Sequence, residues 1–118
     1  MKSHLIGLSL GAAAGLADCA IFAISGMSIS FASALSAVLF WMGVGWAVNV
    51  VRTSLPSSLH GGFIALFLNL PWVAEFVGNQ GLTDLLMPML ATAAAFGVLL
   101  GLASHSLRRL PVSGDAPA

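Results

Sequence analysis

The stretch GLSLGAAAGLADCAIFAIS, residues 7–25, is apolar apart from Asp18 and two serines. About 20 mostly apolar residues in a helix span the hydrocarbon core of a bilayer. The apolar character extends further, because Asp18 is the only charged residue between Lys2 and Arg52. That interval is too long for one crossing and fits two. Residues 7–25 therefore predict the first helix of a membrane-spanning hairpin.

The composition of the whole chain agrees with that prediction. Hydrophobic residues make up 58% of the 118 residues and charged residues 7%, and the mean hydropathy is +1.01. Soluble domains carry about 25% charged residues, so this chain cannot build a water-facing surface. A net charge of zero gives no reason to expect nucleic acid as a partner. The single cysteine excludes an internal disulfide and a CxxC motif.

Turn-forming residues divide the chain into four predicted spans at 4–25, 31–51, 59–77 and 84–107. The turns are SGMSIS (25–30), RTSLPSS (52–58) and GNQGLTD (78–84). The fold predicted from them is an all-α, four-helix membrane bundle over residues 1–109. The polar, Pro-rich tail at 110–118 is predicted to be disordered.

The charged residues predict how the bundle is oriented. The basic side chains fall at one set of helix ends and two acids flank the third turn on the other side: Lys2, Arg52, Arg108 and Arg109 against Glu75 and Asp84. Lys and Arg prefer cytoplasmic loops. Both termini are therefore predicted to be cytoplasmic, with the protein in the cell inner membrane.

A cleaved lipoprotein signal is the alternative for the N-terminal segment. LADC, residues 16–19, resembles the LAGC box of bacterial lipoproteins, and Lys2 supplies a positive start. The position before the cysteine is normally small, however, and here it is Asp18. The apolar run also continues past Cys19, which favours a membrane span.

A weak internal similarity suggests a tandem repeat of two helical hairpins. A shift of 56 residues aligns 4–52 with 60–108 and gives seven identities, and five of these fall between 37 and 52. There GWAVNVVR (45–52) lies over GLASHSLR (101–108). A tandem pair of hairpins would form a parallel repeat about an axis along the membrane normal.

Small residues at four-residue spacing predict where helices approach closely. One row consists of Gly7, Gly11 and Gly15, and the other consists of Ala93, Gly97 and Gly101. These rows could pack on each other or could pair copies of the protein. Ordinary tight packing without a further function explains them as well.

Packing of the two rows on each other would bring three histidines to one depth, namely His4, His60 and His105. Histidines can bind a metal or serve as axial haem ligands. The simpler interpretation is that polar residues are favoured at helix ends near the headgroups. No H-x-x-x-H motif or cysteine partner supports a metal site, and no cofactor is predicted.

Asp18 lies within the first predicted span, and no Lys or Arg lies inside any span to pair with it. A charged carboxylate there is costly, so a polar partner, water or a proton must satisfy it. Asn69 is the obvious partner, because Pro71 frees a backbone carbonyl near it and can kink the helix. With Glu75, these residues could form a small polar cavity that binds a cation or proton. Alternatively, Asp18 only hydrogen-bonds a neighbouring helix.

The sequence contains no H-E-x-x-H and no P-loop, and no enzymatic activity is predicted. The favoured function is that of a structural or accessory membrane component that acts by helix packing, either with itself or within a larger complex. The alternative is a small carrier or channel that uses Asp18 with Asn69 and Glu75.

Overall fold

The structure, a computed structural model, describes residues 1–111, and these form an all-helical bundle. Its elements are α1 (Lys2–Ile24), α2 (Phe31–Val50), α3 (Ser57–Val73), a π-helical segment η1 (Ala74–Asn79), a 3-10 turn η2 (Thr83–Leu85) and α4 (Leu86–Arg109). Within these residues, four helical stretches are long and apolar enough to cross a membrane. The predicted all-α fold is therefore confirmed, and the helices indicate a multi-pass protein in a lipid bilayer. Of the predicted tail 110–118, residues 112–118 lie outside the described part.

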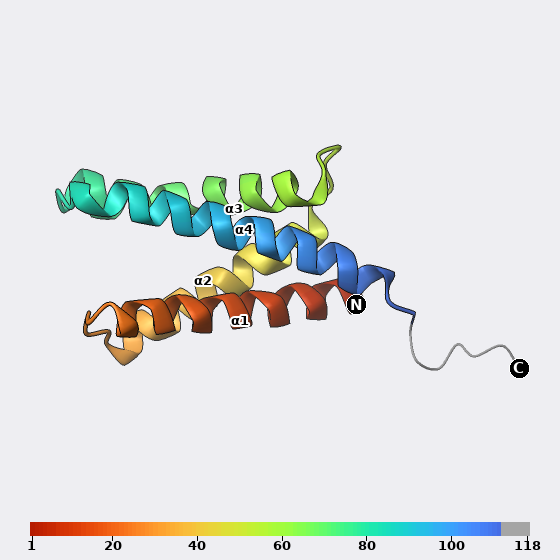
Figure 1. The fold of residues 1–118 in the computed structure, drawn as a ribbon, viewed down its shortest axis with the longest axis horizontal. Coiled ribbons are helices and arrows are strands. Elements are labelled where there is room, and N and C mark those ends of the chain that lie inside the picture. Colours follow the sequence, from red (N-terminus) through yellow and green to blue (C-terminus); the bar gives the residue numbers. More distant parts are fainter. Residues whose placement is uncertain (112–118) are drawn as a thin grey trace, which may run out of the picture.

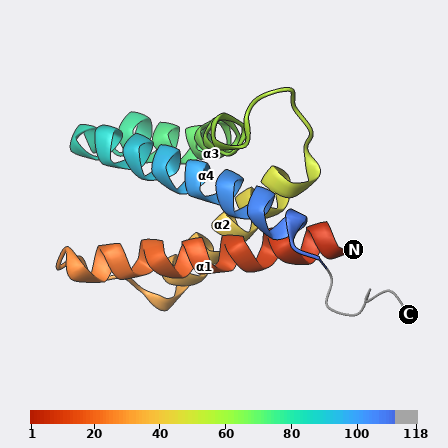
Figure 2. The ribbon, with the colours of Figure 1, turned by 45° about the vertical axis from the view of Figure 1, so that its right-hand side comes forward.

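The four helices form two hairpins, α1 with α2 and α3 with α4. Figure 1 shows the hairpins crossing one another, with the start of α1, the end of α4 and the α2–α3 connection at one end of the bundle. We call this the basic end, because it carries Lys2, Arg52, Arg108 and Arg109. The opposite, loop end carries residues 25–30 and 80–82. Turned by 45°, the bundle shows the hairpins spreading apart toward the loop end (Figure 2).

Local capping explains the tight turn of the first hairpin. Gly26 has a φ of +76°, and its N–H donates to the Ala23 carbonyl while that of Met27 donates to the Phe22 carbonyl. This pattern is a Schellman motif, in which glycine adopts the left-handed conformation that ends a helix. Ser30 then caps α2, because its hydroxyl accepts the N–H of Ser33 at 3.1 Å. The turn therefore fixes an antiparallel return after very few residues.

The second hairpin turns through a wider segment. Pro71 lies inside α3 and cannot donate to the carbonyl one turn earlier. Regular α-helix ends two residues later, and the chain continues as the π-helix η1. The N–H of Leu82 donates back to the Phe76 carbonyl at 2.9 Å, and Gly81 has a φ of +70°. The return is thus made by η1, one left-handed glycine and η2.

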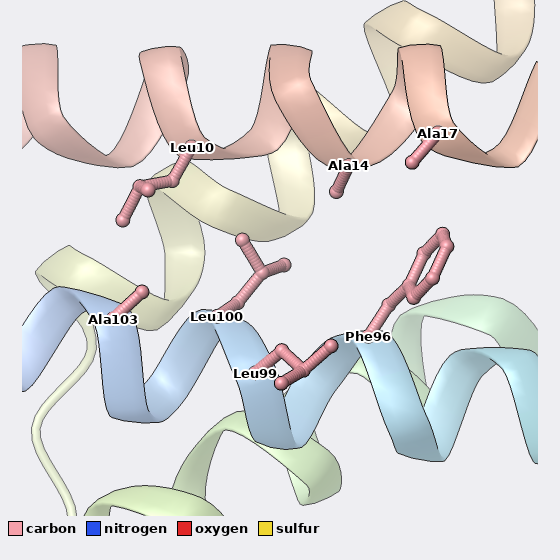
Figure 3. A pocket seen from close by; sticks show the side chains of 7 residues that line it. All are labelled: Leu10, Ala14, Ala17, Phe96, Leu99, Leu100 and Ala103. Carbon is pink, nitrogen blue, oxygen red and sulfur yellow. The ribbon is translucent and has the colours of Figure 1, made fainter.

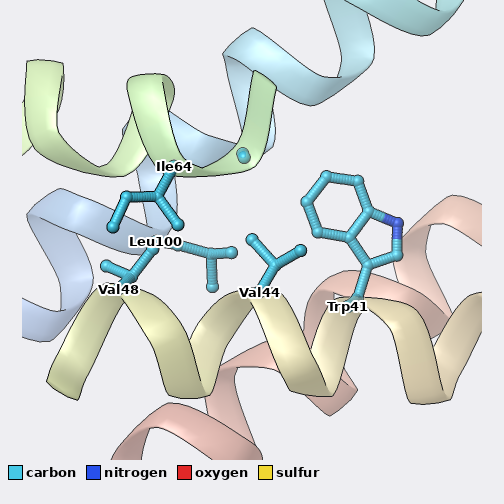
Figure 4. Packing of buried hydrophobic residues seen from close by; sticks show 6 residues of the cluster. Trp41, Val44, Val48, Ile64 and Leu100 are labelled. Atoms are coloured by element: carbon cyan, nitrogen blue, oxygen red, sulfur yellow. The ribbon is translucent and has the colours of Figure 1, made fainter. Parts of the chain in front are cut away.

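The core lies where the two hairpins meet (Figure 4). Its buried members come from three helices: Trp41, Val44 and Val48 of α2, Ile64 and Ala65 of α3, and Leu100 of α4. Trp41 also packs edge-on against Phe40 and Phe96, with ring centroids 5.4 and 5.1 Å apart. α2 is therefore the helix through which the hairpins are joined.

Candidate functional site

Glycines bring the backbones of α1 and α2 into direct contact. A Cβ atom added at Gly7 would lie 2.6 Å from the Gly45 carbonyl oxygen, and one at Gly15 would lie 2.6 Å from the Val38 Cα. A Cβ at Gly11 would overlap the carbonyl oxygen of Trp41. Real Cβ atoms essentially never come within 3.0 Å of such neighbours. Only glycine therefore permits this approach, and we call this contact the first seam.

The second hairpin has a seam of the same kind. A Cβ at Gly97 would lie 2.6 Å from the Cβ of Ala65, and a Cβ at Gly61 would overlap the Gly97 carbonyl oxygen. An added Cβ at Gly101 would collide with the carbonyl oxygen of Ser57. α3 and α4 therefore touch through their backbones along this second seam.

The glycine rows therefore do not pack on each other, and each packs on the other helix of its own hairpin. Their counterparts, Gly45 on α2 and Gly61 on α3, are not part of either predicted row. Four-residue spacing identifies a packing face, but it does not say which helix covers that face. A short connection makes the neighbouring helix the nearest partner, and this signal could have identified Gly45 and Gly61.

The two seams correspond to one another, but the residue numbers of matching positions differ by one amount in the first helix of each hairpin and by another amount in the second helix. In the first seam Gly45 contacts Gly7 and Gly11, and in the second seam Gly101 contacts Ser57 and Gly61 in the same way. The first helices of the hairpins therefore correspond at 50 residues (57 − 7) and the second helices at 56 (101 − 45). The six extra residues fall between α3 and α4, in the segment that contains η1 and η2. His4 and His60, which the 56-residue alignment pairs, do not occupy equivalent places.

Asp18 is half-buried and bonds within its own hairpin. The indole Nε1–H of Trp41 donates to its Oδ2 at 3.0 Å. The donor is therefore a core residue of α2, and the predicted partner, Asn69, lies elsewhere. A buried tryptophan N–H normally finds an acceptor, so one contact satisfies both groups.

The other two members of the predicted cation site are separate from Asp18. Asn69 is buried and its Nδ2 donates to the Met89 carbonyl of α4 at 3.3 Å. Glu75 is exposed in η1, where its carboxylate accepts from Asn79 at 2.7 Å and Gln80 at 3.1 Å. The three residues of the predicted site are therefore apart: Asp18 lies in the first hairpin, Asn69 in the second and Glu75 in the η1 turn. Of these three, Asp18 is the only ionisable one inside a hairpin.

The three histidines have different surroundings. The exposed His4 accepts the indole N–H of Trp46 on its Nδ1 at 2.9 Å. His60 is buried, and its Nε2 bonds the Val48 carbonyl at 2.9 Å while its Nδ1 bonds the Thr53 hydroxyl at 2.8 Å. His105 is half-buried on α4. Over residues 1–111, no three His, Cys, Asp or Glu side chains lie close enough to hold one metal ion.

A polar contact that sequence reasoning missed crosses the junction between the hairpins. The Nδ2 of Asn49 donates to the Ser104 hydroxyl at 2.8 Å and to the Gly45 carbonyl at 2.9 Å. Both side chains are buried, with exposed fractions of 5% for Asn49 and 0% for Ser104. The Oδ1 of Asn49 has no partner among the described residues. This bond links α2 to α4 deep inside the bundle.

An apolar cleft of about 200 Å³ lies between α1 and α4 (Figure 3). Its lining consists of Leu10, Ala14, Ala17, Phe96, Leu99, Leu100 and Ala103. These side chains contain only carbon beyond the backbone, so they offer a ligand van der Waals contact and no hydrogen bond. The cleft therefore suits an acyl chain or an apolar side chain and provides no path for an ion.

A comparison with known protein families, curated proteins and solved structures finds no match for this chain.

Proposed function

We propose that this protein is a structural or accessory component of a membrane, which acts by helix packing with itself or within a larger complex. One observation carries the proposal: the buried polar side chains bond to neighbouring helices. Asn49 bonds Ser104, His60 bonds the Val48 carbonyl and Asn69 bonds the Met89 carbonyl. In lipid such bonds hold helices together, and the Nδ2 groups of Asn49 and Asn69 and the ring of His60 are used in this way.

The two seams support the same role. Lipid provides no hydrophobic force between helices, so close packing of small residues must supply their association. Each hairpin has such packing internally, which leaves the outer faces of all four helices for lipid or for another chain. We infer that the hairpins are a tandem repeat, because Gly11 and Gly61, and likewise Gly45 and Gly101, make corresponding backbone contacts in the two seams.

The proposed setting is the cell inner membrane, with the basic end in the cytoplasm. All four basic residues lie at that end, as the preference of Lys and Arg for the cytoplasmic side requires. A reporter fused after Arg109 should then be active in the cytoplasm, and one inserted at Asn79 should be active outside it. An external signal from the C-terminal fusion would contradict this orientation.

Self-association or complex formation can be tested by extracting the protein from its membrane without detergent, in lipid nanodiscs held by a polymer. Two copies with different tags should purify together, or the particle should contain further chains and exceed the mass of one copy. Recovery of a single chain from its native membrane at native abundance would contradict the proposal. Tryptophan substitution of exposed positions, such as Leu16, Leu39, Phe67 and Leu99, should disrupt the assembly on one face only.

One observation favours a second candidate function, a small proton or cation carrier. Asp18 is ionisable, half-buried and located on a membrane-length helix, and such residues often mark ion pathways. Asp18→Asn retains a carbonyl acceptor for Trp41 but removes the ionisable group. Flux driven by a pH or cation gradient in liposomes that is present in the wild type and absent in Asp18→Asn would establish the carrier. We expect no flux from either protein.

A further inference from the structure

A polar cavity of about 260 Å³ opens at the basic end of the bundle, away from the apolar cleft. The α2–α3 connection, the start of α3 and the end of α4 line it, through Arg52, Thr53, Ser57, His60, Gly101 and Arg108. None of these residues takes part in the Asn49–Ser104 bond that joins the hairpins. His60, Ser57 and Gly101 belong to the helix packing described above, whereas the charges of Arg52 and Arg108 are not explained by it.

The two arginines give this cavity a positive charge that no acidic side chain among residues 1–111 compensates. The Nε–H of Arg108 donates to the Ser104 carbonyl at 3.2 Å, and within residues 1–111 its two terminal amino groups have no hydrogen-bond partner. Among residues 1–111 the acidic side chains are those of Asp18, Glu75 and Asp84, and none of them lines the cavity. Arginine side chains carry a positive charge in proteins, so two positive charges line the cavity.

Hydrogen bonds and close packing hold the α2–α3 connection, which carries Arg52, against the neighbouring helices. The ring of His60 bonds the Val48 carbonyl on one side and Thr53 on the other. Since a carbonyl can only accept, the Nε2 of His60 carries a proton. Ser57 is in turn pressed against Gly101, where no Cβ could fit. The connection next to Arg52 is thus held against α3 and α4, and Arg52 and Arg108 line the same cavity.

We propose that Arg52 and Arg108 bind the phosphate group of an anionic ester in this cavity. Guanidinium groups match the geometry of phosphate oxygens and form two parallel charge-assisted hydrogen bonds to them. Two sources supply this chemistry at the end of a membrane-spanning bundle: the headgroup of an anionic phospholipid and a soluble phosphate ester. All the lining residues belong to one chain, so the site does not depend on self-association.

Native mass spectrometry of the full chain tests the proposal with three variants. Arg52→Gln and Arg108→Gln each remove one charge from the cavity. Arg109→Gln is the matched control, because Arg108 and Arg109 are both exposed and only Arg108 lines the cavity. The protein is titrated with phosphatidylglycerol, with phosphatidylcholine and, separately, with glycerol 3-phosphate. Thermal melting of each variant verifies that the bundle stays folded.

The wild type and Arg109→Gln should bind one anionic ligand with equal affinity. Arg52→Gln and Arg108→Gln should each bind it about tenfold more weakly or worse, because each removes charge-assisted hydrogen bonds to the phosphate. Arg108→Lys should bind with intermediate affinity, because lysine keeps the positive charge but cannot form the two parallel hydrogen bonds of a guanidinium group. Arginine-dependent binding of phosphatidylglycerol alone identifies a lipid site, and arginine-dependent binding of glycerol 3-phosphate identifies a soluble ester. Equal loss in Arg108→Gln and Arg109→Gln, or no arginine-dependent binding of either phosphatidylglycerol or glycerol 3-phosphate, would overturn the proposal.

Discussion

Contacts within each hairpin and contacts between the hairpins are built in different ways. Inside a hairpin, glycines let backbone touch backbone, as where Gly7 and Gly11 meet Gly45. Between the hairpins, large side chains such as Trp41 and Leu100 fill the space, and the Asn49–Ser104 bond crosses it. A seam of glycines has no side chain that can move aside, whereas side chains at the junction can change rotamer. The hairpins should therefore behave as rigid units and their junction as the adjustable part.

The largest effect should come from adding a methyl group to a seam. Gly45→Ala places a Cβ 2.8 Å from the Gly11 Cα and against the Gly7 carbonyl, so the two helices must move apart. Overpacking of this kind costs about 1–3 kcal/mol or more. Gly43→Ala is the matched control on the same helix, because nothing lies within 4 Å of its added Cβ. Thermal unfolding in detergent should show a clearly lower melting temperature for Gly45→Ala only. Equal melting temperatures for the two variants would mean that the seam tolerates a side chain, and it would then not differ from the junction.

A smaller effect is expected at the junction. Asn49→Ala and Ser104→Ala each break the bond between α2 and α4, and interhelical bonds in membranes average about 0.6 kcal/mol with a maximum near 1.7. The two losses should not add, because either change breaks the same bond. A double-mutant cycle measured by unfolding in mixed micelles checks this. Fully additive losses would mean that Asn49 and Ser104 stabilise the bundle independently.

The smallest effect is expected for Asp18→Asn. The carbonyl oxygen of an asparagine can still accept the indole N–H of Trp41, so the free energy of unfolding should change by no more than about 0.5 kcal/mol. Asp18→Leu leaves that N–H without its acceptor, at a cost of about 1 kcal/mol. Comparison of the two melting curves separates the hydrogen bond from the charge. If both substitutions destabilised the bundle equally, the ionised carboxylate itself would be required.

The helices could be predicted from the sequence because hydropathy and turn residues act locally. Gly26 and Ser30, for example, end one helix and start the next through bonds that span only a few residues. The pairing of α1 with α2 and of α3 with α4 also follows, since short turns force neighbouring helices to lie side by side. These are the parts of the fold that need no knowledge of distant contacts.

The candidate site could not be predicted in the same way, because its contacts depend on helix rotation. Asp18 and Trp41 meet only once the first seam sets which face of α2 points at α1. Asn49 lies among apolar residues in the sequence, and its partner Ser104 is 55 positions away. Neither bond has a local signal. The prediction of Asn69 as the partner of Asp18 failed to account for this rotation, and Asn69 instead bonds α4.

The confinement of each seam to one hairpin has a consequence for how the protein is made. A ribosome completes α1 and α2 before α3 emerges, and chain segments assemble in the order of their synthesis. Every backbone contact of the first seam is available at that moment, so the first hairpin can close in the membrane while the rest of the chain is still being translated. The second hairpin then arrives as a finished unit that has only to dock. Docking is left to Trp41, Asn49 and their neighbours, which are the last contacts to form.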